Sequence, residues 1–99
     1  MNMQNLMREA QKMQAELTKT QKELENTEYE GSSSLVSVKI NGKKELISLK
    51  INAEDSIEKD DIELLEDMVV VAINDAMKKA DSDKEKKLSK YGQGLAGLM

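Results

Sequence analysis

The spacing of apolar residues changes twice along this 99-residue chain, and that change constrains the fold more than any other feature. Residues 3–27 place apolar side chains at helical spacing, residues 36–51 alternate them at every second position, and residues 60–80 return to helical spacing. Recurrence at three and four positions is typical of an amphipathic helix, whereas alternation is typical of a half-buried strand. The sequence therefore predicts two long helices on either side of a strand hairpin.

The first helix carries a narrow apolar seam of the heptad kind. A helix with so narrow a seam needs a partner surface, which is either this protein's own sheet or a second chain. The chain has only two aromatic residues with which to fill a core of its own, so we expect a second copy to supply part of the stabilisation. The seam continues through Thr20, Leu24 and Thr27, and its expected dimer-interface positions are Met3, Leu6, Ala10, Met13 and Leu17.

The strand region is organised around Asn41-Gly42, the strongest short signal for a two-residue hairpin turn, because both residues accept positive φ. A turn of that length fixes the strand register and places the apolar residues of both strands on one face. The predicted pairs are Ile40 with Lys43, Val38 with Glu45, and Val36 with Ile47.

The segment before the hairpin is short and polar. We expect residues 28–30 to add a third strand, because a two-stranded ribbon alone is marginally stable. Gly31 and the three serines that follow it break the helical pattern and predict a loop, bend or bulge. The result is a small antiparallel sheet of three strands.

The second long helix is predicted to start near Asp60, which forms a capping-box pattern with Glu63. Residues 83–91 predict a short helical extension with Leu88 as its apolar contact, and residues 91–99 predict a flexible glycine-rich tail. We expect residues 1–99 to form a single domain. The broad apolar face of the helix indicates a core position, and its members are Ile62, Leu65, Met68, Val69, Ala72, Ile73, Ala76 and Ala80.

Composition excludes several kinds of chemistry. The chain has no Cys and no His, so it lacks thiol nucleophiles, disulfides, thiolate metal sites and the usual general base near neutral pH. The acidic stretch 54–61 lacks the ligand spacing of a calcium loop, and no glycine motif for phosphate binding is present. We therefore expect no enzyme activity, metal, cofactor or small-molecule substrate. No apolar run reaches membrane-spanning length and no signal peptide is evident, so we expect a cytoplasmic protein without a membrane partner.

Charge is distributed unevenly along the chain. The formal net charge is −4, but residues 45–75 carry −8 whereas residues 76–99 carry +3. Lysine suits phosphate oxygens, and a chain with a single Arg has little capacity to read base edges. From charge alone, a solvated surface is the favoured interpretation of these lysines. The basic residues of interest are Arg8, Lys12, Lys19 and Lys22 in the first helix and Lys84, Lys86, Lys87 and Lys90 after the acidic segment.

The order of these elements resembles a known family over essentially the whole chain. The matching segments are Met3-Gln4, Met13-Gln14, Glu30-Gly31, the hairpin 36–43, Leu49-Lys50-Ile51, residues 61–69, residues 72–79 and residues 94–99. The chain is similar in these segments to the YbaB/EbfC family of bacterial nucleoid-associated DNA-binding proteins. It departs from the family pattern at Ser32-Ser33-Ser34, where more glycine is usual, and at Ala96, where many members have Pro.

The resemblance implies an α+β fold and a tweezer-like homodimer with a sheet core and projecting helical arms. It also implies a nucleoid protein, not an enzyme, that binds double-stranded DNA with little or modest sequence preference. The first helix and the C-terminal helical region would make the contacts, which points to the eight basic residues named above. The alternative is an interaction module that uses the first heptad helix as an adaptor for another protein.

Overall fold

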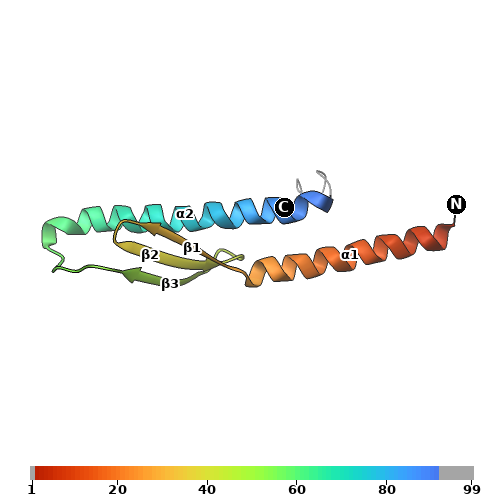
Figure 1. The fold of residues 1–99 in the computed structure, drawn as a ribbon, viewed down its shortest axis with the longest axis horizontal. Helices are drawn as coiled ribbons and strands as arrows, with labels where there is room; N and C mark the ends of the chain where they lie inside the picture. Colours follow the sequence, from red (N-terminus) through yellow and green to blue (C-terminus); the bar gives the residue numbers. More distant parts are fainter. Residues whose placement is uncertain (1, 92–99) are drawn as a thin grey trace.

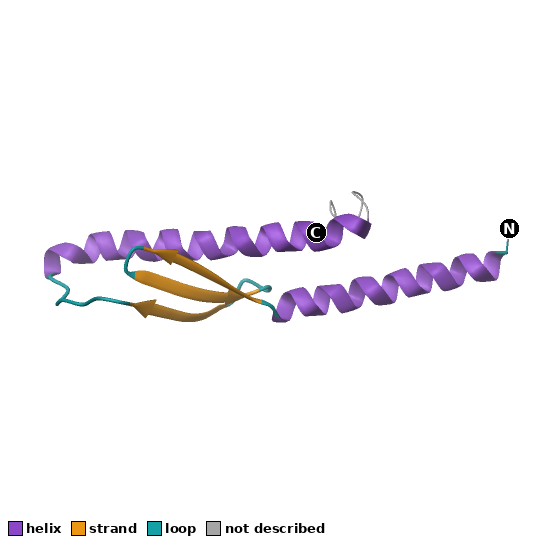
Figure 2. Cartoon of the chain, in the orientation of Figure 1, coloured by secondary structure: helices purple, strands orange, loops and turns teal. Residues whose placement is uncertain are grey.

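The computed structural model describes residues 2–91 and has an α+β fold. In chain order it consists of a long helix, three antiparallel strands and a second long helix (Figures 1 and 2). Short 3₁₀ turns at Lys59–Asp61 and Ser89–Tyr91 precede and follow the second helix. The predicted fold class is therefore confirmed. The elements are α1 (Met3–Asn26), β1 (Glu28–Ser33), β2 (Val36–Asn41), β3 (Leu46–Ile51) and α2 (Ile62–Leu88).

The core lies between α2 and the first two strands. The strand order is β1-β2-β3, and α2 packs along β1 and β2 but leaves β3 uncovered (Figure 1). Three alanines of α2 allow this close packing: Ala72, Ala76 and Ala80 lie against Val36, Val38 and Ile40 of β2. The predicted apolar face of α2 is thus confirmed at its centre.

The first turn of α2 lies outside that core. Ile62, which the apolar pattern places on the core face, is 44% exposed. The reason is geometric, because α2 begins beyond the ends of β1 and β2, where no strand covers it (Figure 1). The 3₁₀ turn before it is held by Asp61, whose carboxylate accepts a hydrogen bond from the Glu58 N–H at 3.2 Å. The observed capping box joins Glu58 and Asp61, so the predicted box of Asp60 with Glu63 is wrong by two residues at both positions.

The molecule is unusually extended for its length. Its principal dimensions are 72 × 19 × 14 Å and its radius of gyration is 19.6 Å. A compact chain of 99 residues would have a radius of gyration of roughly 13 Å. The difference comes from α1, which points away from the sheet and whose first half extends past the end of α2 (Figure 1).

The hairpin between β2 and β3 differs from the prediction. The observed pairs are Ile40 with Leu46, Val38 with Leu49 and Val36 with Ile51, with a bulge beside Ile40. The predicted register was therefore wrong by several residues. The shared apolar face is kept nonetheless, because directly opposed residues of antiparallel strands point to the same side.

The reason for the longer turn is a contact with α1. A Cβ at Gly42 would lie 1.7 Å from the Leu24 carbonyl oxygen, so glycine is required here by close approach and not by positive φ. Lys44, at φ 65°, is the residue in the left-handed region. The Asn41 side-chain oxygen closes the turn by accepting from the N–H groups of Lys43 at 2.9 Å and Glu45 at 3.0 Å.

Two further boundaries differ from the sequence interpretation. Gly31 and the next two serines belong to β1, and the two-residue turn falls at Ser34 and Leu35, where Ser34 has φ 49°. The predicted separate segment at 83–91 is instead a continuation of α2 to Leu88 followed by the 3₁₀ turn. Of the predicted tail 91–99, Tyr91 belongs to that turn and residues 92–99 lie outside the described residues.

Candidate nucleic-acid interface

The basic residues of α1 form one exposed face of that helix. Their spacings of four, seven and three residues correspond to nearly whole helical turns, so the side chains lie on one side of α1. The four residues are Arg8, Lys12, Lys19 and Lys22. We call these four residues the basic stripe. All four are exposed. Local sequence favours the helix at its start, because the Asn2 side chain accepts a hydrogen bond from the Gln4 N–H at 3.0 Å.

The opposite face of α1 attaches the helix to the rest of the molecule. Leu17 and Leu24 are 7% and 6% exposed and pack with Leu88 of α2. Tyr91 packs against this cluster, and its hydroxyl is 3.2 Å from Thr20 Oγ1. Because the attachment uses the apolar face, the basic stripe is left facing solvent.

The predicted dimer seam on α1 is divided by this attachment. Leu17 is buried within its own chain, whereas Met3, Leu6 and Met13 are 72%, 45% and 55% exposed. Ala10 is also exposed. The first half of α1 therefore presents an apolar surface on one side and basic residues on the other.

The four predicted lysines near the end of α2 do not share one environment. Lys86 and Lys90 are exposed, and the Lys90 Nζ lies 5.2 Å from the centre of the Tyr91 ring. Lys87 forms an ion pair with Asp83 at 3.1 Å. Lys84 is half-buried and faces a crevice next to α1. Three of the four are therefore exposed, and two of these, Lys86 and Lys90, form no ion pair within residues 2–91.

Asp83 links Lys87 to the sheet. The Tyr29 hydroxyl donates to Asp83 Oδ2 at 2.6 Å. Burial, together with the hydrogen bond to the Asp83 carboxylate and its negative charge, raises the pKa of Tyr29 to about 12. The same hydrogen bond, with help from Lys87, holds the pKa of Asp83 below its usual value. These contacts fix the end of α2 against β1.

We expect the Tyr29 phenol to ionise near pH 12, and the Asp83→Asn variant to lower that pKa part of the way toward 10, because the carboxylate charge is removed whereas burial, the largest cause, remains. The folded state holds this proton more tightly than the unfolded chain. Its stabilising effect is thus complete below pH 10 and is lost as the pH rises toward 12. Ultraviolet absorbance at 295 nm measures the ionisation, and Tyr29→Phe identifies which signal belongs to Tyr29. An unchanged Tyr29 pKa in Asp83→Asn would contradict this assignment.

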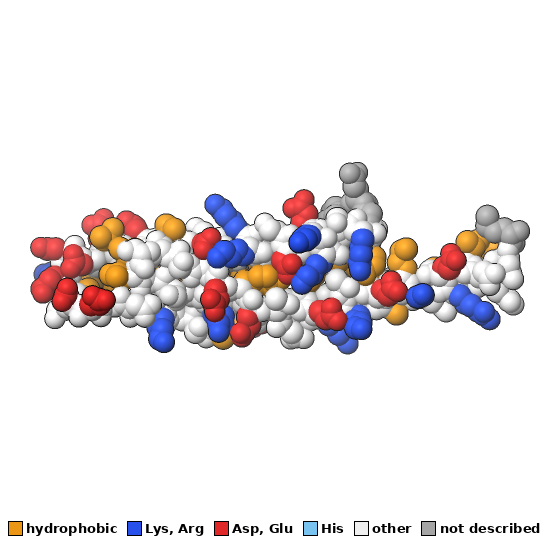
Figure 3. Space-filling view, in the orientation of Figure 1, with side chains coloured by type: hydrophobic (Ala, Val, Ile, Leu, Met, Phe, Trp, Pro, Cys, Tyr) orange, Lys and Arg blue, Asp and Glu red, His pale blue; other side chains and the backbone are white. Residues whose placement is uncertain are grey.

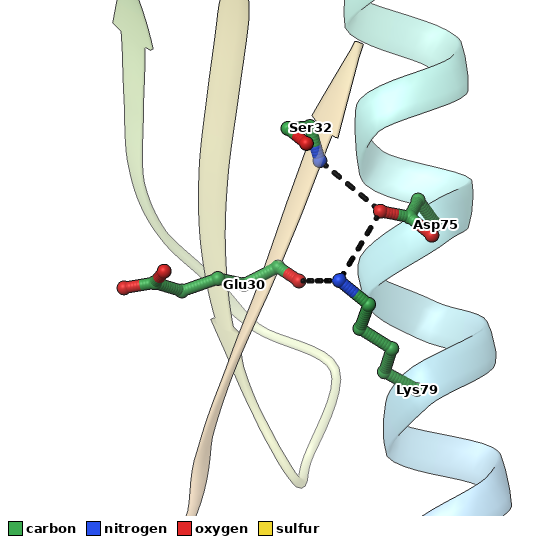
Figure 4. Close-up of polar contacts among 4 residues, drawn as sticks. All are labelled: Glu30, Ser32, Asp75 and Lys79. Carbon is green, nitrogen blue, oxygen red and sulfur yellow. Dashed lines mark hydrogen bonds and ion pairs between the residues drawn. The ribbon is translucent and has the colours of Figure 1, made fainter.

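Lys78 and Lys79, which lie earlier in α2, also differ in their contacts. Lys79 donates to the Glu30 carbonyl oxygen at 2.9 Å and pairs with Asp75 at 3.4 Å (Figure 4). Asp75 in turn accepts from the Ser32 N–H at 3.2 Å, which lowers the pKa of its carboxyl. These side chains occupy the outer edge of β1, as Figure 4 shows. Lys79 therefore has a structural role, whereas Lys78 is exposed.

The structure also brings together residues that sequence reasoning missed. Lys43 and Lys44 lie in the turn between β2 and β3, next to α1 and α2. The Lys44 Nζ is 2.8 Å from Asp81 Oδ1 of α2. Nothing in the local sequence predicts this position, because it depends on the contact between Gly42 and α1.

Acidic and basic side chains are separated along the long axis. Acidic side chains gather at the end where α2 begins, and lysines gather over the C-terminal half of α2 (Figure 3). Charges in water are screened over about 8–10 Å at physiological salt, which is much less than the 72 Å length. The acidic end of the molecule therefore has little influence on an anion at the basic stripe, which lies on a helix with four basic and four acidic side chains.

Other kinds of site find little support in residues 2–91. This part of the chain contains no group of three or more acidic side chains placed to hold a metal ion. A hollow of about 440 Å³ lies between the start of α2 and the loop after β3, with Leu35, Ile57 and Leu64 in its lining. None of the described helices has the length and apolar character needed to cross a bilayer. The fold and its charged surfaces define an elongated α+β protein with basic residues on helical arms.

Comparison with known proteins identifies the family. The model of the YbaB/EbfC DNA-binding family matches residues 1–95, and the chain belongs to this family. A nucleoid-associated protein of Ligilactobacillus salivarius is 38% identical over 99 residues, with 99% of this chain and 95% of the relative covered. A nucleoid-associated protein of Streptococcus suis is 43% identical over 97 residues, with 96% of this chain and 97% of the relative covered. The resemblance noted in the sequence is thus confirmed.

A solved structure shows the same fold. The crystal structure of an uncharacterized protein from Helicobacter pylori superposes with a TM-score of 0.70 at 23% identity. The match covers 93% of this chain and 99% of the other. The arrangement of two long helices and a three-stranded sheet is therefore shared by a protein of much lower sequence similarity.

Proposed function

We propose that this protein binds double-stranded DNA at the bacterial nucleoid, mainly through backbone phosphates and with little sequence preference. The basic stripe of α1 makes the principal contacts, and Lys86 and Lys90 of α2 add to them. In this proposal the protein organises the nucleoid and affects gene expression through its occupancy of DNA, without catalysing a reaction.

One observation carries this proposal: the basic stripe faces solvent as a unit, on the side of α1 opposite its attachment to α2. The first half of α1, which carries Arg8 and Lys12, extends past the end of α2, so a straight duplex can approach this part of the stripe (Figure 1). Lysine ammonium groups attract phosphate oxygens without distinguishing bases. Family membership and the names of the relatives support the same conclusion.

Two unrelated duplexes of equal length test the lack of sequence preference. Fluorescence anisotropy at one low salt concentration should give dissociation constants within about threefold of each other. Specific binders, by comparison, typically prefer their site by at least about 10³. A difference on that scale would overturn the proposal of phosphate-directed binding, and failure to bind either duplex would overturn the proposed function.

We propose that the active form is a homodimer that buries the apolar surface around β3. β3 is an edge strand that α2 leaves uncovered, and the apolar residues on and near it are 38–57% exposed. An exposed apolar patch of this kind is typical of an interface. Its members are Leu35, Leu46, Ile47, Leu49, Ile51, Ile57 and Leu64. The exposed part of the α1 seam, namely Met3, Leu6, Ala10 and Met13, is the second proposed contact.

Light scattering at micromolar concentration should give about twice the chain mass of 11.1 kDa. Leu49→Lys should give the monomer mass, because it places a charge in the proposed interface. Val70→Lys on α2 is the matched control and should remain dimeric, because Val70 is exposed and belongs to neither proposed contact. A dimeric Leu49→Lys variant would contradict the interface around β3, and a monomeric unmodified protein would contradict the dimer.

The exposed α1 seam also favours a second function, as an adaptor that binds another protein. Met3, Leu6 and Met13 could pack against a partner helix in the manner of a coiled coil. In that case DNA binding would be absent even at low salt. The duplex titration described above therefore separates the two functions.

A further inference from the structure

A basic crevice lies where the turn between β2 and β3 meets both long helices. It has a volume of about 430 Å³, and its walls come from the last turns of α1, from the turn and from α2. Three lysines line it, namely Lys43 and Lys44 of the turn and Lys84 of α2. These lysines come from two segments that are far apart in the sequence and belong to neither the basic stripe nor the exposed end of α2.

The crevice is held in place on both sides. Gly42 lies directly against the Leu24 carbonyl of α1, with no room for a side chain. On the other side, Lys44 bridges to Asp81 of α2 at 2.8 Å. The Asn41 side chain fixes the turn through hydrogen bonds to the backbone of Lys43 and Glu45. The backbone that carries Lys43 is thus positioned before any ligand arrives.

The charges facing the crevice leave a positive balance. Two carboxylates lie near the three lysines. Glu25 lines the crevice, and Asp81 forms an ion pair with Lys44. Lys43 and Lys84 take part in no ion pair within residues 2–91. Two ammonium groups on one concave surface favour an anion with several oxygens, such as a phosphodiester.

We propose that this crevice receives a backbone phosphate of duplex DNA, held by Lys43 and Lys84. The proposal rests on the proposed function and adds a contact that the helices alone do not supply. Lys22, the last residue of the basic stripe, lies three positions before Glu25, so stripe and crevice are neighbours on the surface of α1. Leu24 of the attachment face also lines the crevice, so the crevice lies around α1 from the stripe, and Glu25 is the residue that adjoins both surfaces.

The test compares two double variants of the full chain with equal charge loss. Lys43→Gln with Lys84→Gln removes the two crevice charges, and Lys50→Gln with Lys59→Gln removes two exposed charges from β3 and from the 3₁₀ turn before α2. Each lost phosphate contact makes the slope of log K against log salt shallower by about 0.9. The crevice variant removes one phosphate contact per chain, so it should lose about 0.9 from the slope per chain, or about 1.8 per dimer, and the control variant should lose almost none.

A third variant gives a gain that misfolding could not produce. Glu25→Gln removes the carboxylate that faces the crevice, and we expect binding at low salt to tighten about three- to fivefold. Circular dichroism checks that each variant keeps the helix content of the unmodified protein. The probe is a fluorescent duplex of arbitrary sequence.

The outcomes separate this inference from the proposed function. If the unmodified protein does not bind the duplex, both fail. If it binds, but the crevice variant keeps the slope of the control variant and Glu25→Gln gives no gain, the crevice proposal alone is overturned. A shallower slope in the crevice variant, together with tighter binding by Glu25→Gln, supports the phosphate contact in the crevice.

Discussion

Gly31→Val should reduce the free energy of unfolding by about 3 kcal/mol or more, at or above the upper end of the usual range for overpacking a core. A Cβ at this position would lie 2.1 Å from the Ala72 carbonyl oxygen and 2.5 Å from the Ala76 nitrogen. Both are backbone atoms of α2, so a change of side-chain rotamer cannot relieve the clash. The helix would have to move away from β1 and thereby open the core around Val38.

Urea unfolding followed by far-ultraviolet circular dichroism measures this loss. The variants must be compared at one protein concentration, because association makes the midpoint depend on concentration. Ser32→Ala is the matched control, since this side chain is exposed and its backbone N–H still reaches Asp75; its midpoint should hardly change. An unchanged midpoint for Gly31→Val would mean that α2 does not lie on β1 as described.

The order and type of the elements could be predicted because they depend on local spacing. The heptad seam that predicts α1 ends at Thr27, and the observed helix ends one residue earlier, at Asn26. The face of α2 that carries Ala72 and Ala76 was recognisable for the same reason, since a helix repeats every 3.6 residues. These patterns follow from each segment by itself and need no knowledge of its neighbours.

The hairpin register could not be predicted, because a distant segment determines it. Asn41-Gly42 favours a two-residue turn on local grounds. In the structure Gly42 is instead placed by Leu24 of α1, and the Asn41 side chain closes a longer turn. The short turn at Ser34 and Leu35 falls at the end of the stretch 31–34 that predicts a loop, while Gly31 to Ser33 belong to β1. Tertiary packing has overridden the local preference at Asn41-Gly42.

The candidate site was only partly accessible to sequence reasoning. The basic stripe follows from residue spacing on a helix, and the Lys87–Asp83 ion pair has the i,i+4 spacing that such pairs require. The half-buried position of Lys84 and the placement of Lys43 beside it depend on how the turn docks between the helices. Sequence spacing alone could not place these lysines in one crevice.

Neutralising the basic stripe should have the largest effect on DNA binding. Lys12→Gln with Lys19→Gln removes two exposed charges per chain that form no ion pair in the described part of the molecule. In a dimer this removes four phosphate contacts, so the slope of log K against log salt should become shallower by about 3 to 4. At about 0.1 M salt the affinity should fall at least about 100-fold.

The salt dependence of duplex binding measures how many phosphate contacts α1 makes. Anisotropy titrations of the unmodified protein, the Lys12/Lys19 variant and the Lys50/Lys59 control are compared at several salt concentrations on one duplex. We predict a straight line with a slope of about −4 to −5 for the unmodified protein, nearly the same slope for the control, and a slope near zero to −2 for the stripe variant. Equal slopes for all three proteins, or no binding at the lowest salt concentration, would contradict the claim that α1 binds the phosphate backbone.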